Sequence, residues 1–116
     1  MGKVQDQAAL DAYRYVLLNL GHVTGYIQWQ RLPRDWLDRE LAGYTQKMIN
    51  ELMATHAKTG GTIHQVVETR PEYIRWRFHY DLRLPISGRR IYIETVFRHE
   101  RDLEDCEIIV VNMHDA

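Results

Sequence analysis

Apolar residues in the first half of the chain recur at the three- and four-residue spacing of amphipathic helices. One stripe predicts a helix over about residues 5–20, and it consists of Leu10, Tyr13, Val16, Leu17 and Leu20. A second stripe predicts a longer helix over about residues 34–57, which begins near Pro33 and ends before Gly60. The second stripe consists of Leu37, Leu41, Tyr44, Met48 and Leu52.

After Gly61 the apolar period changes to two, which is typical of β-strands. The alternation predicts a hairpin with its turn at residues 85–88 and four strands in all, over about residues 62–69, 72–84, 89–99 and 106–114. The segment 23–31 suits either a fifth strand or an ordered loop. Short connections favour antiparallel pairing. We therefore expect one α+β domain over residues 1–116, in which two N-terminal helices pack on one face of an antiparallel sheet of four or five strands.

Composition excludes several classes of protein. The chain has 116 residues, 45% of them hydrophobic and 27% charged, as in ordinary globular domains. The formal net charge of -1 excludes a globally basic nucleic-acid binder but leaves room for a local basic patch. Cys106 is the only cysteine, so no disulfide within the chain and no CxxC motif can form, and we expect a cytoplasmic protein. No apolar stretch is long enough for a transmembrane helix, so we expect no membrane partner.

The polar side of the predicted strands is rich in arginine. In EYIRWRFHYDLRL (72–84), apolar side chains alternate with polar ones, and most of the charged ones are arginines. With the next strand, this face is expected to carry Asp81, Glu94 and five arginines, which are Arg75, Arg77, Arg83, Arg90 and Arg98. Arginine's planar fork suits bidentate contact with phosphate. A solvated face with cross-strand ion pairs explains the same pattern without a ligand.

Aromatic and ionisable side chains lie among these arginines and suggest a site for RNA. Bases of a single strand would stack on tyrosines while arginines contact the phosphates. The expected ligand-binding residues are Tyr73, Arg75, Arg83, Arg90, Tyr92 and Arg98. For catalysis, His79 is the candidate acid or base, Glu94 its counterpart, and Arg77 the group that stabilises developing charge. Such a set would cleave RNA through its own 2′-hydroxyl, without a metal or another cofactor.

Two helices followed by a sheet that ends in RRIYIETVF and CEIIVVNMH resemble the order of elements in RelE-like and barnase-like small ribonuclease toxins. The resemblance covers about residues 35–114. It implies that substrate binds the sheet face away from the helices, and an antitoxin-like protein partner would fit the acidic loop of residues 99–107. The expected function is thus binding of RNA or another phosphate-bearing ligand, with toxin-type endoribonuclease activity on the arginine-rich face.

A cone-shaped fold similar to the NTF2-like or cystatin-like families is the alternative. It would be a non-enzymatic module that binds a small molecule or a protein, and the arginine-rich face would become a homodimer interface. Its pocket would be lined by aromatic residues, which are Trp29, Trp36, Trp76, Tyr80 and Phe97. The six histidines suggest metal binding as a further hypothesis, because His79 and Asp81 share a strand face. The sequence contains no HxxxH motif and no Cys/His cluster, so we expect no metal site.

Overall fold

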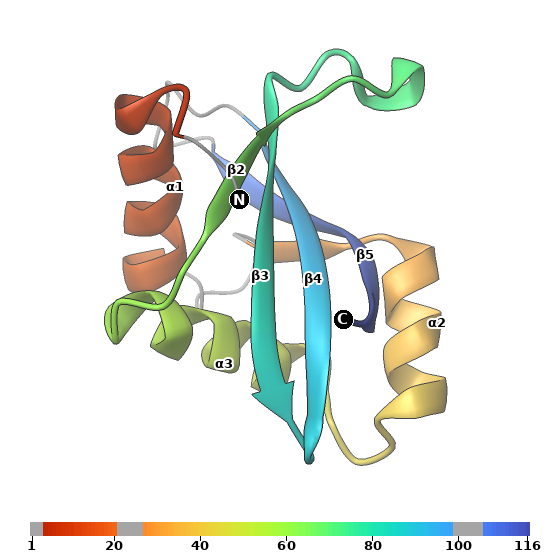
Figure 1. Cartoon of the computed structure of the whole chain (residues 1–116). Coiled ribbons are helices and arrows are strands. Elements are labelled where there is room, and N and C mark those ends of the chain that lie inside the picture. Colours follow the sequence, from red (N-terminus) through yellow and green to blue (C-terminus); the bar gives the residue numbers. More distant parts are fainter. Residues whose placement is uncertain (1–3, 21–26, 99–105) are drawn as a thin grey trace.

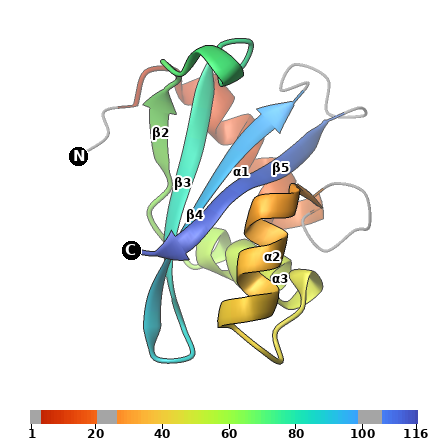
Figure 2. The same cartoon turned by 90° about the vertical axis from the view of Figure 1, so that its right-hand side faces the viewer.

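The computed structural model describes residues 4–20, 27–98 and 106–116. In these residues three α-helices pack with one five-stranded mixed sheet of order β1-β5-β4-β3-β2 (Figures 1 and 2). The elements are α1 (Gln7–Leu20), β1 (Ile27–Trp29), α2 (Arg31–Glu40), α3 (Gln46–Lys58), β2 (His64–Val67), β3 (Phe78–Ile86), β4 (Arg89–Arg98) and β5 (Glu107–Asp115). None of the described helices has the length and apolar character needed to cross a membrane. The predicted α+β class is confirmed, whereas residues 99–105 of the predicted acidic loop and residues 23–26 of segment 23–31 lie outside the described residues.

One edge of the sheet is parallel, so the expectation of a purely antiparallel sheet is wrong there. β2, β3, β4 and β5 pair antiparallel, and β1 pairs parallel with β5, Gln28 lying opposite Ile109. The three-residue strand β1 lies beside β5, which is the last strand in the sequence, rather than beside β2, which follows it in the sequence. No hairpin therefore dictates its direction.

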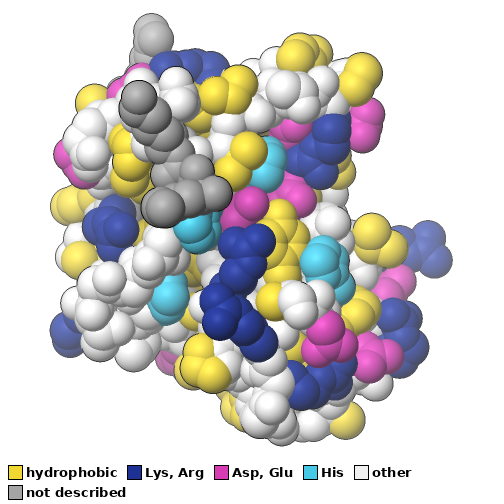
Figure 3. All heavy atoms as spheres, viewed as in Figure 1, with side chains coloured by type: hydrophobic (Ala, Val, Ile, Leu, Met, Phe, Trp, Pro, Cys, Tyr) yellow, Lys and Arg dark blue, Asp and Glu magenta, His cyan; other side chains and the backbone are white. Residues whose placement is uncertain are grey.

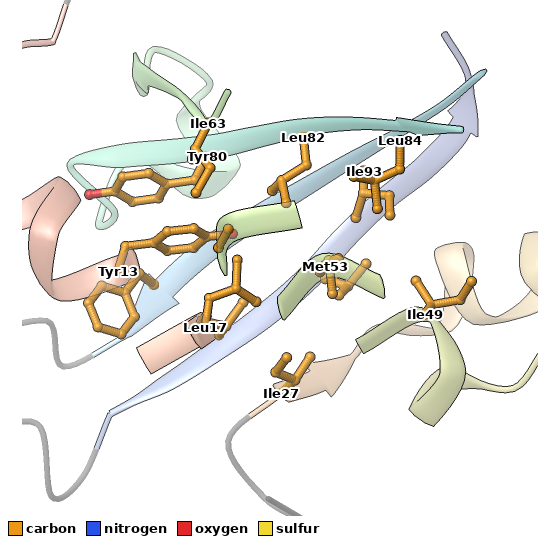
Figure 4. Close-up of a cluster of buried hydrophobic side chains, with 14 of the residues drawn as sticks. Tyr13, Leu17, Ile27, Ile49, Met53, Ile63, Tyr80, Leu82, Leu84 and Ile93 are labelled. Atoms are coloured by element: carbon orange, nitrogen blue, oxygen red, sulfur yellow. The ribbon is translucent and has the colours of Figure 1, made fainter. Parts of the chain in front are cut away.

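The core lies against one face of the sheet and takes buried side chains from α1, α2 and α3 (Figure 4). Tyr13 of α1 is fully buried, stacks on Tyr80 with ring centroids 4.2 Å apart, and meets Phe97 edge-on at 5.8 Å. Its hydroxyl lies 2.7 Å from Thr95 Oγ1, and Thr95 in turn donates to the Tyr80 carbonyl at 2.8 Å. Burying each large apolar side chain contributes about 1.5–3 kcal/mol, and these contacts also orient α1 on β3 and β4.

The predicted helix over residues 34–57 is two helices, α2 and α3. The chain turns between them at Gly43, whose φ of +94° is a left-handed conformation that suits glycine. Thr45 caps α3 by accepting a hydrogen bond from the Met48 amide at 3.1 Å. The break also changes the phase of the apolar stripe, so that the buried residues of α3 are Ile49, Met53 and Ala57, while Met48 and Leu52 are exposed.

The strand predicted over residues 72–84 begins later, at Phe78. Pro71 starts a 3-10 turn over Pro71–Tyr73, and the Trp76 amide donates to the Tyr73 carbonyl at 2.9 Å. Proline's fixed φ suits the first position of such a turn. The alternating letters of residues 72–77 therefore do not describe a strand, and the expectation that Tyr73 and Arg75 lie on its polar face is wrong.

The β3 to β4 hairpin has the predicted facing of side chains. Core-facing residues of β3 pair with core-facing residues of β4, as in Leu82 opposite Ile93, and Asp81 lies opposite Glu94 on the other face. In β5 a β-bulge interrupts the alternation, because Glu94 pairs with Asn112 but Thr95 pairs with Val110. The bulge explains why neither parity of the predicted strand 106–114 is clearly polar.

Candidate functional site

Charged side chains gather on the face of β3 and β4 that points away from α1 and α3. Figure 3 shows basic, acidic and histidine side chains next to one another over these strands. We call five of them the charge cluster: Glu68, Arg70, His79, Asp81 and Glu94. Glu68 reaches it because its amide extends the β2 to β3 pairing by one hydrogen bond, to the Arg77 carbonyl at 3.0 Å.

Arg70 joins two buried carboxylates of the charge cluster. Its Nη2 lies 2.8 Å from Glu68 Oε1, its Nε donates to Glu68 Oε2 at 3.0 Å, and it also donates to both carboxylate oxygens of Glu94. The side chains of Glu68 and Glu94 are only 1% and 4% exposed, whereas that of Arg70 is 35% exposed. Hydrogen bonds from Arg70 outweigh the effect of burial and hold the pKa of Glu68 at about 2.

His79 lies beside these carboxylates and is oriented by Asp81. Its Nδ1 is 2.7 Å from Asp81 Oδ1. Burial alone would lower the pKa of His79, but the hydrogen bond to Asp81 and the charges of Asp81, Glu94 and Glu68 raise it overall. One ligating atom from each of Glu68, His79 and Glu94 lies within 4.8 Å of the other two. The cluster therefore brings together a histidine and three carboxylates.

Tyr92 lies on β4 between the charge cluster and the turn of the β3 to β4 hairpin. Its hydroxyl donates to Glu94 Oε1 at 3.3 Å, its ring stacks on His114 with centroids 4.7 Å apart, and the Arg83 guanidinium lies 5.1 Å from its centroid. Burial and the neighbouring carboxylates of Asp81 and Glu94 raise the pKa of Tyr92 far above its usual value. The phenol thus stays a hydrogen-bond donor at neutral pH.

A hollow at the end of the hairpin carries three arginines. It has a volume of about 460 Å³ and is lined by Arg83, Pro85, Gly88, Arg89 and Arg90. The turn itself is shorter than predicted: only Ser87 and Gly88 connect the strands, both with positive φ, as a tight two-residue hairpin requires. Arg89 is held by Asp115 at 2.7 Å and by Glu40 at 3.3 Å. We call this surface the arginine hollow.

The arginines differ in whether a carboxylate neutralises them. Arg77 pairs with Asp6 at 2.6 Å and lies over the Phe78 ring, and Arg98 pairs with Glu107. Arg83 and Arg90, by contrast, form no ion pair with any residue that the structure describes. These two are the basic groups of the arginine hollow that remain open to an added anion.

The structure brings part of the predicted site together. His79 and Glu94 meet in the charge cluster, and the other predicted residues on the same face are Arg83, Arg90, Tyr92 and Arg98. Tyr73 lies next to the charge cluster, because the Arg70 guanidinium is 4.7 Å from its ring centroid, and Arg75 lies over Trp76 at 4.9 Å. Sequence reasoning missed Glu68 and Arg70, although Glu68 continues the parity of His64 and Val66 on the polar face of β2.

No protein-family model, curated protein or solved structure matches the chain. What the site can do therefore has to be derived from its own geometry. That geometry offers two distinct chemistries on one sheet face: a carboxylate-rich cluster around His79, and a pair of arginines without carboxylate partners around the hairpin.

Proposed function

We propose that the protein binds a phosphate-bearing ligand, namely single-stranded RNA, on the outer face of β3 and β4. The observation that carries the proposal is the arginine hollow, in which Arg83 and Arg90 lack carboxylate partners within the described chain. An arginine held in a concave surface presents several N–H donors in a rigid plane, which matches the geometry of phosphate oxygens.

Ion pairing within the protein makes four other arginines on or near these strands less suitable as ligand contacts. Arg70, Arg77, Arg89 and Arg98 each have a carboxylate partner, so a phosphate would have to compete with it. Beside the arginine hollow, the exposed ring of His114, which stacks on Tyr92, offers an aromatic surface. Stacking of a base on an aromatic side chain contributes about 1–3 kcal/mol with little dependence on sequence.

Cleavage of the bound RNA is a second candidate function, and His79 is the observation that favours it. With a raised pKa, the imidazole would be available as the general acid that protonates the leaving 5′-oxygen. The predicted base, Glu94, is 4% exposed and accepts hydrogen bonds from Arg70 and Tyr92, so it would have to release one of them before taking a proton from a 2′-hydroxyl.

The binding test is fluorescence anisotropy with a labelled single-stranded RNA at several salt concentrations. We expect the double variant Arg83→Ala/Arg90→Ala to bind RNA weakly. The slope of log binding constant against log salt concentration should fall in magnitude by about 1.4, since each phosphate contact on a single strand contributes about 0.7. The matched control, Arg31→Ala/Arg34→Ala, removes the same charge from the exposed N-terminal turn of α2. Equal weakening in both variants, or no binding by the wild type at low salt, would refute the proposal.

The same samples run on a denaturing gel test cleavage. If His79 is the general acid, His79→Gln should abolish cleavage while the anisotropy titration stays close to that of the wild type. Intact RNA with the wild type would leave a binding function only. A chain that neither binds nor cleaves RNA and sediments as a dimer would favour the alternative of an interaction module whose arginines lie in the subunit interface.

A further inference from the structure

We propose that Glu68, His79 and Glu94 form a binding site for a divalent transition-metal ion such as Zn²⁺ or Mn²⁺, and that Arg70 is the internal cation with which the metal competes. The site is separate from the arginine hollow and needs no bound RNA. It goes beyond the proposed function because it adds a second ligand, of a different chemical class, on the same sheet face.

The donor set and its burial support a metal site. Glu68 directly follows β2, His79 lies on β3 and Glu94 on β4, and each presents one ligating atom within 4.8 Å of the others. Carboxylate oxygens together with an imidazole nitrogen are the mixed ligands that Zn²⁺, Mn²⁺ and Fe²⁺ take in proteins. Both glutamates are almost inaccessible to water, so their positions are set by the sheet rather than by solvent.

Asp81 supplies an independent indication. His79 Nδ1 is hydrogen-bonded to Asp81 Oδ1 at 2.7 Å, so the other ring nitrogen, Nε2, is the one left for a ligand. A carboxylate on one imidazole nitrogen and a metal on the other is a recurrent arrangement, in which the carboxylate orients the ring and increases its basicity. Substitution of such a carboxylate typically costs about 10–100-fold in metal affinity.

The charge of the cluster points the same way. Three buried carboxylates, those of Glu68, Asp81 and Glu94, face one guanidinium, that of Arg70. A histidine that ligates a metal is neutral, and in that state the cluster has a formal charge of -3 + 1 = -2, which is the charge that one divalent ion would neutralise. Arg70 is the most exposed of the group and follows β2 on a loop, so it is the cation that a metal ion would have to displace from the two glutamates.

A purely structural ion-pair network and a metal site differ in what removal of Arg70 does. If the cluster only holds the sheet together, Arg70→Gln weakens the fold and gains no ligand. If Arg70 competes with a metal, Arg70→Gln removes a repelling charge from the site and raises metal affinity by several-fold. A gain of metal binding on loss of this guanidinium therefore distinguishes competition at a metal site from a structural ion pair.

The experiment is calorimetric titration of the full chain, first freed of metal with a chelator, using Zn²⁺ and Mn²⁺ in separate runs. We expect one ion per chain, affinity at least 10-fold lower in Glu68→Gln/Glu94→Gln and 10–100-fold lower in Asp81→Asn, and tighter binding in Arg70→Gln. The control variant Asp35→Asn/Asp38→Asn removes two exposed carboxylates of α2 and should bind as the wild type does.

Visible absorption of bound Co²⁺ reports the ligand set directly and should change in His79→Gln. Absence of binding in both the wild type and Arg70→Gln would overturn the proposal, as would equal affinity in Glu68→Gln/Glu94→Gln and the control. Near-ultraviolet circular dichroism checks that each variant is folded. If a glutamate variant is unfolded, the comparison of metal affinity between the wild type and Arg70→Gln decides the question. Because Arg83→Ala/Arg90→Ala should still bind metal, failure of the RNA proposal and failure of this one are distinguishable.

Discussion

Removal of the Arg70 guanidinium, which joins Glu68 to Glu94, should lower the free energy of unfolding more than removal of an exposed charge does. We consider Arg70→Met, which retains much of the length of the side chain and removes its charge and hydrogen bonds. The two carboxylates it leaves are 1% and 4% exposed. Breaking a buried ion pair from one side typically costs about 3–5 kcal/mol, because the remaining charge stays buried without a partner.

Exposure of Arg70 itself reduces that figure. Its side chain is 35% exposed, so water already screens part of the interaction. We therefore expect Arg70→Met to lower the free energy of unfolding by about 2–3 kcal/mol. Adding Glu68→Gln/Glu94→Gln in the Arg70→Met background removes the unpaired charges and should recover most of the loss.

Urea denaturation at neutral pH, in the presence of a chelator, measures these differences. The pH dependence gives a second readout. Glu68 has a pKa of about 2 in the folded protein, below its usual value of 4.5, so its ion pair stabilises the fold above pH 4.5 and is lost as the pH falls towards 2. The difference in stability between wild type and Arg70→Met should narrow over that window.

Two results would refute this reasoning. An Arg70→Met variant within 0.5 kcal/mol of the wild type, about the usual effect of a surface substitution, would mean that the cluster is not dependent on Arg70. A difference that stays constant down to pH 2 would mean that the glutamates are not the groups left without a partner.

Three further substitutions test the fold. Thr95→Val should lower the free energy of unfolding by about 1–3 kcal/mol, because it leaves the buried Tyr13 hydroxyl without its partner. Adding Tyr13→Phe should cost little more, and additive losses in urea denaturation would contradict the shared hydrogen bond. Ile93→Ala, at a fully buried position, should cost about 3 kcal/mol, and a loss below 1 kcal/mol would argue against this core. Gly43→Ala should lower the thermal midpoint at a cost of about 1 kcal/mol through its φ of +94° alone, since open space surrounds the new methyl group, and an unchanged midpoint would speak against a left-handed turn there.

Local patterns predicted the parts of this fold in which local and long-range preferences agree. The stripe that includes Tyr13 and Leu17 gave α1, and alternation placed Leu82 and Ile93 in the core. The break near Gly43 was missed because leucines continue at helical spacing up to Leu41 and mask the change of phase beyond it.

The candidate site was predictable only where both partners lie on one hairpin. His79, Glu94 and Tyr92 were found because alternation along the two hairpin strands places their side chains on one face. Arg70 was missed because it lies on the loop after β2, outside the alternating pattern, and its partner Glu94 is 24 positions away, on β4. For the same reason, no local signal indicated that Arg77 is neutralised by Asp6, which is 71 positions away.

The position of β5 has a consequence for how the chain folds. β5 lies between β1 and β4, although it comes last of the five strands in the sequence. Until it is inserted, β1 has no neighbour to pair with, and β4 exposes a free edge that could pair with another chain. Closing the sheet joins segments about 80 residues apart, and such non-local pairing slows folding into the range of milliseconds to seconds. We therefore expect folding to be limited by the insertion of β5, and chains truncated before this strand to aggregate rather than to fold in part.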